Sequence, residues 1–493
     1  MNFLDPVFLF FFPAAFAAVH ATPRRYRYLP LLAASCLFYG WRTPAVTVIP
    51  LLCTVWTWAG GAALGKAMQA EAEGRAFPFL FSPNVLFRFF FLSNILLLAV
   101  FKYAGFFSAA LGCPLDLAAP VGLSFYIFQS SGYLGSIRRR ELPPERNILR
   151  YAAFVSFFPT LLSGPIQRAP ELLPQLQGKS RTAPPDYRTG FLLFLWGIFG
   201  KLVVSAKLSA VTSAVFASPD SFSGAACLLA AILLSFYIYV DFASYSDIAA
   251  GCACMLGFPV GANFRTPFLS SSLKEFWNRW HISLNRWFIE NVYIPLGGSR
   301  KGALCRYRNV LFVFLLSGAW HGSAGHFVVW GGLNGAAMIL EELLASALRK
   351  KQSVIEAPES GGRLSSALLL WLRRLAVLLV VSLNFIFFGA ASVRDALRFL
   401  ARILSIRLPD ITGFMPTSLF GWDRNVMYQT AAAFLFFLLV QYQRHEEGAA
   451  LRRFQRLPAV LRHMLPAVIL TLCIFAACAQ TARTNTAFLY YRF

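Results

Sequence analysis

Charged residues are scarce in this 493-residue chain. Only 14% of its residues are Asp, Glu, Lys or Arg, whereas 57% are hydrophobic and 16% are aromatic. A soluble globular domain carries about 25% charged residues, so the composition indicates a polytopic membrane protein. The alternating ten-residue segments typical of a transmembrane barrel are also missing. We therefore predict an all-α fold of about 11–13 transmembrane or re-entrant helices in a single domain over residues 1–493.

Several catalytic signatures are absent as well. The chain has no Walker A sequence, no His-Glu-x-x-His and no Gly-x-Ser-x-Gly. These absences weigh against nucleotide-driven pumping, zinc proteolysis and serine hydrolysis. The nine cysteines are scattered, and the close pair Cys252 and Cys254 has no second pair at zinc-binding spacing. We predict no bound metal or other cofactor and no structural disulfide.

Acidic residues are fewer than basic ones, 22 against 45, which gives a formal net charge of +23. We reject a nucleic-acid partner, because the basic residues lie in short loops between apolar runs, where the positive-inside rule and anionic lipids explain them. Arg24, Arg25 and Arg27 follow the first apolar run, which predicts a cytoplasmic loop there and an N-terminus outside. That run lacks a basic leader, so it predicts a retained helix and not a cleaved signal peptide.

The longest stretch without any charged residue is 309–340, which contains His321 and His326. Its length and apolar character predict two membrane helices folded around a break at residues 322–325. A histidine inside hydrocarbon is costly unless it has a partner or a water-filled cavity, so function is the first hypothesis. Simple packing against a neighbouring helix is the alternative.

Other polar residues also interrupt apolar runs. The side chains of Gln129 and its neighbours are predicted to face the interior of the helix bundle. There they either form hydrogen bonds between helices or line a substrate path. Pro159, Gly164 and Pro165 predict a broken helix at membrane depth. Asp241 and Tyr245, four residues apart, share a helix face. A buried Asp241 carboxylate needs a partner. It either orients a distant imidazole or joins neighbouring helices by hydrogen bonds, and we favour the second interpretation.

Residues 272–298 combine tryptophans with basic residues. Ser272 followed by Glu275 is a capping box, which predicts a helix start. A single helix from there would place one set of residues on an apolar face (Trp277, Trp280, His281, Leu284 and Phe288) and another on a polar face (Asn278, Arg279, Ser283 and Arg286). Such a helix is typical of the membrane interface, although this explains Asn278 and His281 poorly.

These residue types permit one chemistry in particular. A buried imidazole has its pKa lowered and can act as a general base, which suits removal of a proton from a hydroxyl that attacks a thioester. Trp, Asn or Arg side chains would stabilise the developing oxyanion. Proton relay in a transporter or lipid flippase uses the same residue types, so the chemistry leaves that alternative open.

Six motifs resemble the membrane-bound O-acyltransferase (MBOAT) family, in the bacterial branch of alginate O-acetylation and teichoic-acid D-alanyl transfer proteins. They are PVGLSFYIFQSSGYL (120–134), FVSFFPTLLSGPIQR (154–168), DFASYSDIAAG (241–251), EFWNRWHISLNRW (275–287), YIPLGG (293–298) and LSGAWHG (316–322). The terminal FLYYRF (488–493) resembles the alginate branch. The motif core spans residues 120–345, and residues 366–493 form the C-terminal helices.

The resemblance implies helices around a central tunnel in the bacterial cytoplasmic (inner) membrane, with His321 as the base. It implies that His281 is a second catalytic or tunnel residue. Further substrate-binding candidates are Trp277, Asn278, Arg279, Trp280, Trp320, Gln129, Tyr245 and Asp241. The expected reaction is acetylation of an exported cell-surface polysaccharide, with D-alanyl transfer toward teichoic acid as the alternative.

The expected partners are membrane lipids and a cytoplasmic acyl donor, either acetyl-CoA or a phosphopantetheine-carried acyl group. An extracytoplasmic acetyl-relay protein or an acyl carrier protein completes the set, the latter docking on the basic segment 274–306. The chain departs from its relatives at two positions: Asn334 stands where many have a histidine, and Gly389 where an arginine is frequent.

Overall fold

The computed structural model describes residues 1–41, 48–75, 78–112, 120–162, 164–178, 186–352, 363–407, 424–443 and 453–481. All regular elements in these ranges are helices, which confirms the all-α prediction. Seven of the described helices are long and apolar enough to cross a membrane, so the chain is a multi-pass membrane protein. The terminal FLYYRF and most of the linker at 350–365 lie outside the described residues.

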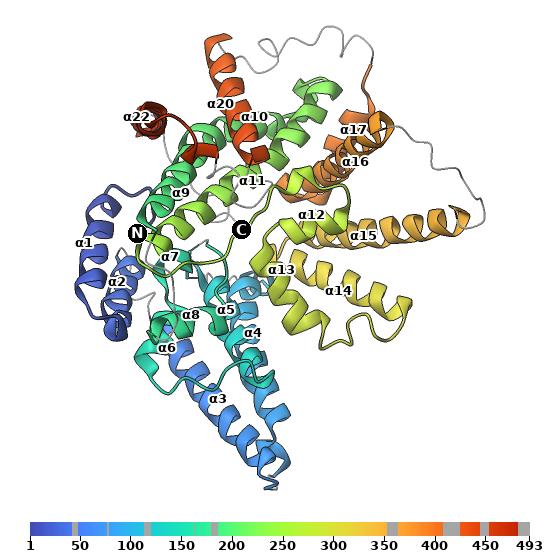
Figure 1. Cartoon of the computed structure of the whole chain (residues 1–493). Helices are drawn as coiled ribbons and strands as arrows, with labels where there is room; N and C mark the ends of the chain where they lie inside the picture. Colours follow the sequence, from blue (N-terminus) through green and yellow to red (C-terminus); the bar gives the residue numbers. More distant parts are fainter. Residues whose placement is uncertain are drawn as a thin grey trace. The chain divides into compact units, whose positions relative to one another are not determined.

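The described residues divide into two compact units, Met1–Phe194 with Tyr245–Ala262, and Leu195–Ser244 with Asn263–Phe493. The helices of the first unit are α1 (Phe8–Ala21), α2 (Tyr28–Gly40), α3 (Val48–Ala72), α4 (Pro83–Ala110), α5 (Leu123–Arg138), α6 (Ile148–Val155), α7 (Phe158–Leu161) and α8 (Ala169–Leu176), with 3-10 turns η1 (Arg24–Tyr26) and η3 (Phe79–Phe81) (Figure 1). Two helices, α9 (Tyr187–Phe199) and α11 (Gly224–Met255), contribute residues to both units.

The second unit contains α10 (Ala206–Ala217), α12 (Leu273–Arg279), α13 (Ile282–Phe288), α14 (Ala303–His321), α15 (Gly325–Gln352), α16 (Arg363–Gly389), α17 (Val393–Leu404), α20 (Arg424–Gln443) and α22 (Ala459–Thr481). It also contains the π-helical segments η4 (Gly200–Ser205) and η7 (Ile289–Tyr293) and the 3-10 turns η5 (Pro219–Ser221) and η6 (Pro267–Leu269). The single domain over residues 1–493 remains a prediction.

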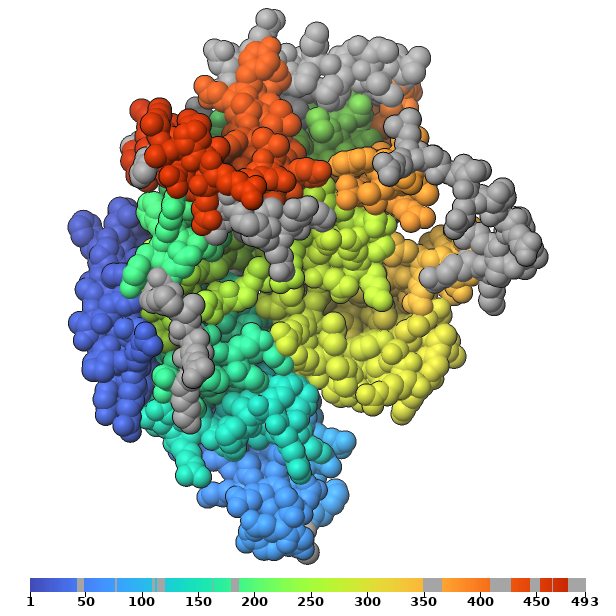
Figure 2. Space-filling view, viewed as in Figure 1, coloured from blue at the N-terminus to red at the C-terminus, as the bar shows by residue number. Residues whose placement is uncertain are grey.

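Aromatic side chains form the core of the first unit. Helices α1 and α2 lie side by side (Figures 1 and 2, dark blue), and the rings of Phe8 and Phe38 meet edge to face with centroids 6.2 Å apart. Phe11 contacts Phe158 of the short helix α7 at 5.3 Å. Helix α7 has only four residues and carries Pro159 in its first turn, so the predicted break at this proline is confirmed.

The polar residues of α5 are buried in the first unit, as their sequence context predicted. Gln129 is 1% exposed, and neither of its side-chain polar atoms has a partner among the described protein atoms. Tyr133 accepts a hydrogen bond from the backbone N–H of Glu145 at 3.0 Å. Tyr245 of α11 contacts the ring of Phe3, with centroids 6.0 Å apart.

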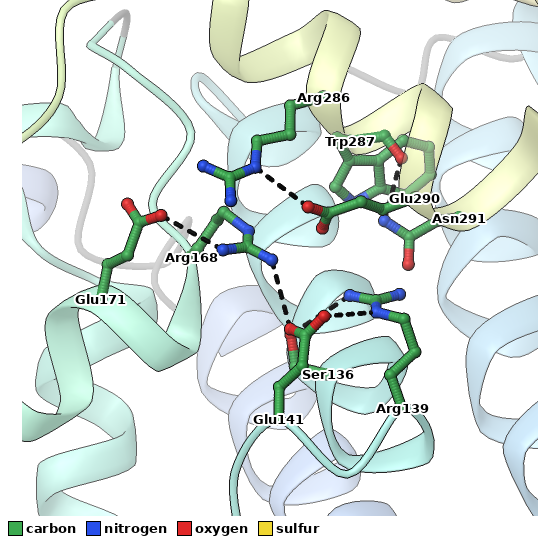
Figure 3. A network of polar contacts seen from close by, with 9 residues as sticks. All are labelled: Ser136, Arg139, Glu141, Arg168, Glu171, Arg286, Trp287, Glu290 and Asn291. Carbon is green, nitrogen blue, oxygen red and sulfur yellow. Dashed lines mark hydrogen bonds and ion pairs between the residues drawn. The ribbon is translucent and has the colours of Figure 1, made fainter. Parts of the chain in front are cut away.

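The loop that follows α5 is tied to α8 by ion pairs. Glu141 accepts hydrogen bonds from Arg139 at 2.8 Å and from Arg168 at 3.2 Å, and Arg168 also pairs with Glu171 at 3.2 Å (Figure 3). These side chains are partly exposed, and such pairs each contribute little to stability. As a network they fix the path of the chain between the two helices.

The apolar stretch 309–340 forms the antiparallel pair α14 and α15, joined at Gly322, so the predicted pair of helices and the break are confirmed. Helix α15 is one of the seven described helices that could cross a membrane, and α14 is not. The two helices lie side by side (Figure 1). Small residues permit their close approach: a Cβ atom on Gly331 would clash with the carbonyl oxygen of Phe314 and lie 3.2 Å from the Cα of Gly318. Gly318 precedes His321 by one turn, so this crossing sets the position of the histidine.

Gly331→Ala is therefore expected to push α14 and α15 apart and to destabilise the protein by about 1–3 kcal/mol, the usual cost of overpacking. It should also lower acyl transfer by displacing His321. Gly332→Ala is the matched control, because its Cβ would meet only Leu315, at an ordinary 3.4 Å. Thermal unfolding of the two variants in the same detergent decides: equal midpoints would contradict the tight crossing.

Candidate active site

The predicted helix start at Ser272 is confirmed, and a distant carboxylate supports it. Ser272 Oγ accepts a hydrogen bond from the N–H of Glu275 at 3.1 Å. Glu341, at the far end of α15's apolar run, accepts the N–H of Leu273 at 2.8 Å. Together these acceptors satisfy the free donors of the first turn of α12.

The prediction of one continuous helix through residues 277–288 is wrong. Helix α12 ends at Arg279, His281 has left-handed backbone angles (φ 43°, ψ 54°), and α13 begins at Ile282. Asn285 stabilises the break by donating its side-chain amide to the carbonyls of Trp277 and Trp280. This conformation is strained for a residue with a side chain, and such strain gathers at functional sites.

The break places His281 in an aromatic environment near His321, the predicted base. His281 is 3% exposed, and its ring meets Phe242 edge to face with centroids 4.7 Å apart. Trp320 lies between the two histidines, with ring centroids 6.3 Å from His281 and 4.6 Å from His321. Burial lowers the pKa of His281 to about 3, so its ring is neutral at pH 7.

His321, at the end of α14, is enclosed mainly by rings. Its imidazole meets Trp330 and Phe388 edge to face, with centroids 5.2 and 5.0 Å apart. Trp330 in turn contacts Trp277 at 6.0 Å. The indole N–H of Trp277 is buried and has no acceptor among the described protein atoms, so it is available to a substrate oxygen.

The remaining predicted residues differ in their placement. Trp280 is buried and stacks on Phe276 at 5.4 Å. Asn278 is exposed on α12, so the structure does not bring its side chain into the enclosed histidine cluster. Arg279 pairs with Glu275 at 2.7 Å. Gln129 and Tyr245 belong to the first unit and are described there.

Asp241 forms a buried ion pair with Lys201, which sequence reasoning overlooked. The carboxylate accepts a hydrogen bond from Lys201 Nζ and another from Ser205 Oγ at 2.6 Å. The side chains of Asp241 and Lys201 are 2% and 5% exposed. Lys201 lies in the π-helical segment η4, a feature frequent near functional sites. The pair supports the helix-tying role for Asp241 and gives no support to its orienting an imidazole.

Three further polar residues belong to the second unit, and of these the sequence patterns do not mark Asn263. Asn263 Oδ1 lies 3.2 Å from His281 Nδ1. His326 donates Nδ1–H to the carbonyl of Phe387 at 2.9 Å. Asn334 donates to the Trp330 carbonyl at 2.8 Å. A Cβ atom on Gly389 would lie 2.5 Å from the Leu234 side chain, so a larger residue there needs that side chain to move.

The end of α13 and the π-helical segment η7 that follows it combine basic and apolar side chains. Arg286 pairs with Glu290 at 3.0 Å, and Asn291 donates to the Trp287 carbonyl at 2.9 Å (Figure 3). In the same segment Ile289 and Ile294 are about half exposed. Within the described ranges, no group of three or more His, Cys, Asp and Glu side chains could hold a metal ion.

Comparison with known proteins shows which family the chain resembles. Residues 86–354 match the sequence model of the MBOAT, membrane-bound O-acyltransferase family. The "Probable alginate O-acetylase AlgI" of Pseudomonas putida is 33% identical over 356 residues, which cover 70% of this chain and 71% of that protein. The peptidoglycan O-acetyltransferase of Helicobacter pylori is 30% identical over 64% of each chain. The teichoic acid D-alanyltransferase of Bacillus subtilis is 28% identical over 44% of this chain and 58% of its own.

The family match spans more than half of the chain and includes the hairpin that carries His321 and the broken helix that carries His281. The chain therefore belongs to the membrane-bound O-acyltransferase family and is a multi-pass membrane acyltransferase.

Proposed function

We propose that this protein transfers acetyl groups from a cytoplasmic thioester donor to hydroxyls of an exported cell-surface polysaccharide, with His321 as the general base. The observation that carries the acetyl assignment is the similarity to alginate O-acetylases, which is greater in identity and coverage than the similarity to the D-alanyltransferase. The similar proteins named above are transferases, which favours an enzyme over a transporter or flippase.

The chemistry requires a base beside an enclosed reaction centre. The His321 imidazole takes the proton of an acceptor hydroxyl as the oxygen attacks the thioester carbonyl. The new ester forms as the carbon–sulfur bond breaks, and the proton passes to the departing thiolate. The rings of Trp320, Trp330 and Phe388 around His321 exclude water, which strengthens electrostatic interactions in the site.

Stabilisation of the oxyanion is assigned to the tryptophans. Trp277 presents a buried indole N–H that has no acceptor among the described protein atoms. It contacts Trp330, which in turn contacts His321. One preorganised donor of this kind contributes about 10²–10³-fold to kcat. Trp320 supports the same site by packing on His321.

Acyl transfer by the purified full-length protein in lipid vesicles tests the proposal. Acetyl-CoA and a D-alanyl-charged carrier protein are offered separately as labelled donors, with alginate, peptidoglycan or teichoic acid fragments as acceptors. We expect label from acetyl-CoA to reach a polysaccharide hydroxyl. Transfer of D-alanine alone would instead establish the alternative, for which the basic segment around Arg286 and Arg300 would dock an acidic carrier. Absence of any transfer with every pair would overturn both.

An acetyl-relay protein on the outer side is a further possible partner under the same proposal. If relay is required, label should leave acetyl-CoA but reach the polysaccharide only when that protein is added.

The proposed orientation places the loop of Arg24, Arg25 and Arg27 in the cytoplasm of a bacterial inner membrane and the N-terminus outside, as the positive-inside rule predicts. A tag at the N-terminus should be accessible to an impermeant label in spheroplasts. Labelling that requires lysis would reverse the orientation.

A further inference from the structure

The side-chain oxygen of Asn263 is the centre of three polar contacts at the break between α12 and α13. It lies 3.2 Å from His281 Nδ1, 3.2 Å from the backbone nitrogen of Ser283 and 2.9 Å from Ser283 Oγ. The backbone carbonyl of Asn263 also accepts the N–H of Ile282 at 2.9 Å. Asn263 is 2% exposed. It therefore binds the strained turn through both its backbone and its side chain.

These contacts determine where His281 carries its proton. A backbone N–H can only donate, so the Asn263 atom that faces Ser283 N must be the carbonyl oxygen and not the amide nitrogen. The same oxygen faces His281 Nδ1. Because an oxygen acceptor requires a donor opposite it, Nδ1 carries the hydrogen and Nε2 of the neutral ring has the free lone pair.

That lone pair has no partner in the protein as described. His281 Nε2 is buried and makes no hydrogen bond with any described protein atom, and Phe242, Phe264 and Trp320 surround the ring. A buried acceptor left unsatisfied is costly, and such groups are rare in native structures. The ring does not escape this cost by taking a second proton, since burial disfavours its charged form.

Two costs thus coincide at one residue, a left-handed backbone and an unsatisfied acceptor. We propose that Asn263 is a positioning residue that fixes the Nδ1–H tautomer of His281, so that Nε2 accepts a hydrogen bond from an N–H or O–H group of a substrate. The assignment rests on the proposed acyl-transfer function only for the identity of that substrate. An amide N–H of the pantetheine arm and a hydroxyl of the acceptor share the required chemistry.

Nitrogen NMR of the full-length protein in lipid bilayers, with ¹⁵N-labelled histidine, tests the tautomer without any turnover. The His281 signals are identified by their loss in His281→Gln. In the wild type at pH 7 we expect the protonated nitrogen to be Nδ1. Asn263→Leu should give a mixture of tautomers, whereas Asn263→Asp, which keeps an oxygen acceptor, and Ser283→Ala, which keeps Asn263, should retain Nδ1–H. A wild-type spectrum with the proton on Nε2 overturns the proposal even if a variant fails to fold.

The ligand is tested by adding CoA or a hydroxyl-bearing polysaccharide fragment at a concentration shown by calorimetry to saturate the protein. The Nε2 signal should move upfield with one of them, which identifies the source of the donor. Its dissociation constant should rise about 2- to 12-fold in Asn263→Leu, the equivalent of one hydrogen bond. An Nε2 signal unmoved by either bound ligand leaves only an ordered water as its partner and refutes the substrate contact, whatever the protein's acyl-transfer activity.

Discussion

Replacing His321 with alanine is expected to lower kcat for acyl transfer by about 10²–10⁴-fold, the usual contribution of a positioned general base. The loss should appear in kcat more than in KM, because the imidazole acts on the proton that moves in the transition state. Steady-state transfer from labelled acetyl-CoA, with the protein in lipid vesicles, measures both constants.

His326→Gln is the matched control for this variant. His326 is buried like His321 and lies five residues further along the same hairpin, but its Nδ1–H is committed to the carbonyl of Phe387. We expect it to lower stability and to leave most of kcat in place. Equal losses of kcat in the two variants would show that any buried histidine of the hairpin is needed for folding, and would remove the argument for a base.

Replacing Lys201 with methionine is expected to destabilise the protein by about 3–5 kcal/mol, because it leaves the carboxylate of Asp241 buried without its cation. Methionine keeps the length and apolar character of the lysine stem, so packing is nearly conserved. Thermal unfolding in detergent measures the change, and acyl transfer should fall with the folded fraction.

The double variant Lys201→Met with Asp241→Leu should be more stable than Lys201→Met alone, since removing both charges removes the uncompensated one. Lys207→Met, on the same helical run, is the control and should change stability by less than about 1 kcal/mol. A loss for Lys201→Met as small as that for Lys207→Met would contradict the buried pair.

The parts of the fold that follow local rules could be predicted from the sequence. The charge-free run 309–340 predicted two helices and the Gly322 break between them. Both the length of the apolar run and the position of the glycine can be read from this one segment. The helix start at Ser272 was likewise predicted from its own capping residues. In both cases the residues that carry the signal lie within a few positions of the break or the helix start, although the distant Glu341 adds a contact at Leu273.

The broken helix at His281 depends on tertiary contacts and could not be predicted from periodicity. The residues Trp277, Trp280, Leu284 and Phe288 are buried as the helical pattern required. However, Asn263 holds the turn from 18 residues away, and nothing in its spacing marks it. The approach of His281 and His321 around Trp320 has the same origin, because 40 residues separate the two histidines.

The sequence carries a partial signal for the partner of Asp241. Lys201 is a charged residue inside the apolar run 190–217, just as Asp241 is inside the run 225–250. Two opposite charges in separate apolar segments each need compensation. Lys207 lies in the first run and Asp247 in the second as well, so the sequence predicts an ion pair between the two segments without selecting its members. Tertiary packing decides that Lys201 and Asp241 form it.

The most direct test of the central claim is single-turnover acyl transfer, which isolates chemistry from product release. Full-length wild type and His321→Ala are each saturated with labelled acetyl-CoA, their donor binding is confirmed, and a polysaccharide hydroxyl acceptor is added. We predict equal donor binding, rapid ester formation by the wild type and almost none by the folded variant. Ester formation at the wild-type rate by folded His321→Ala would contradict the account.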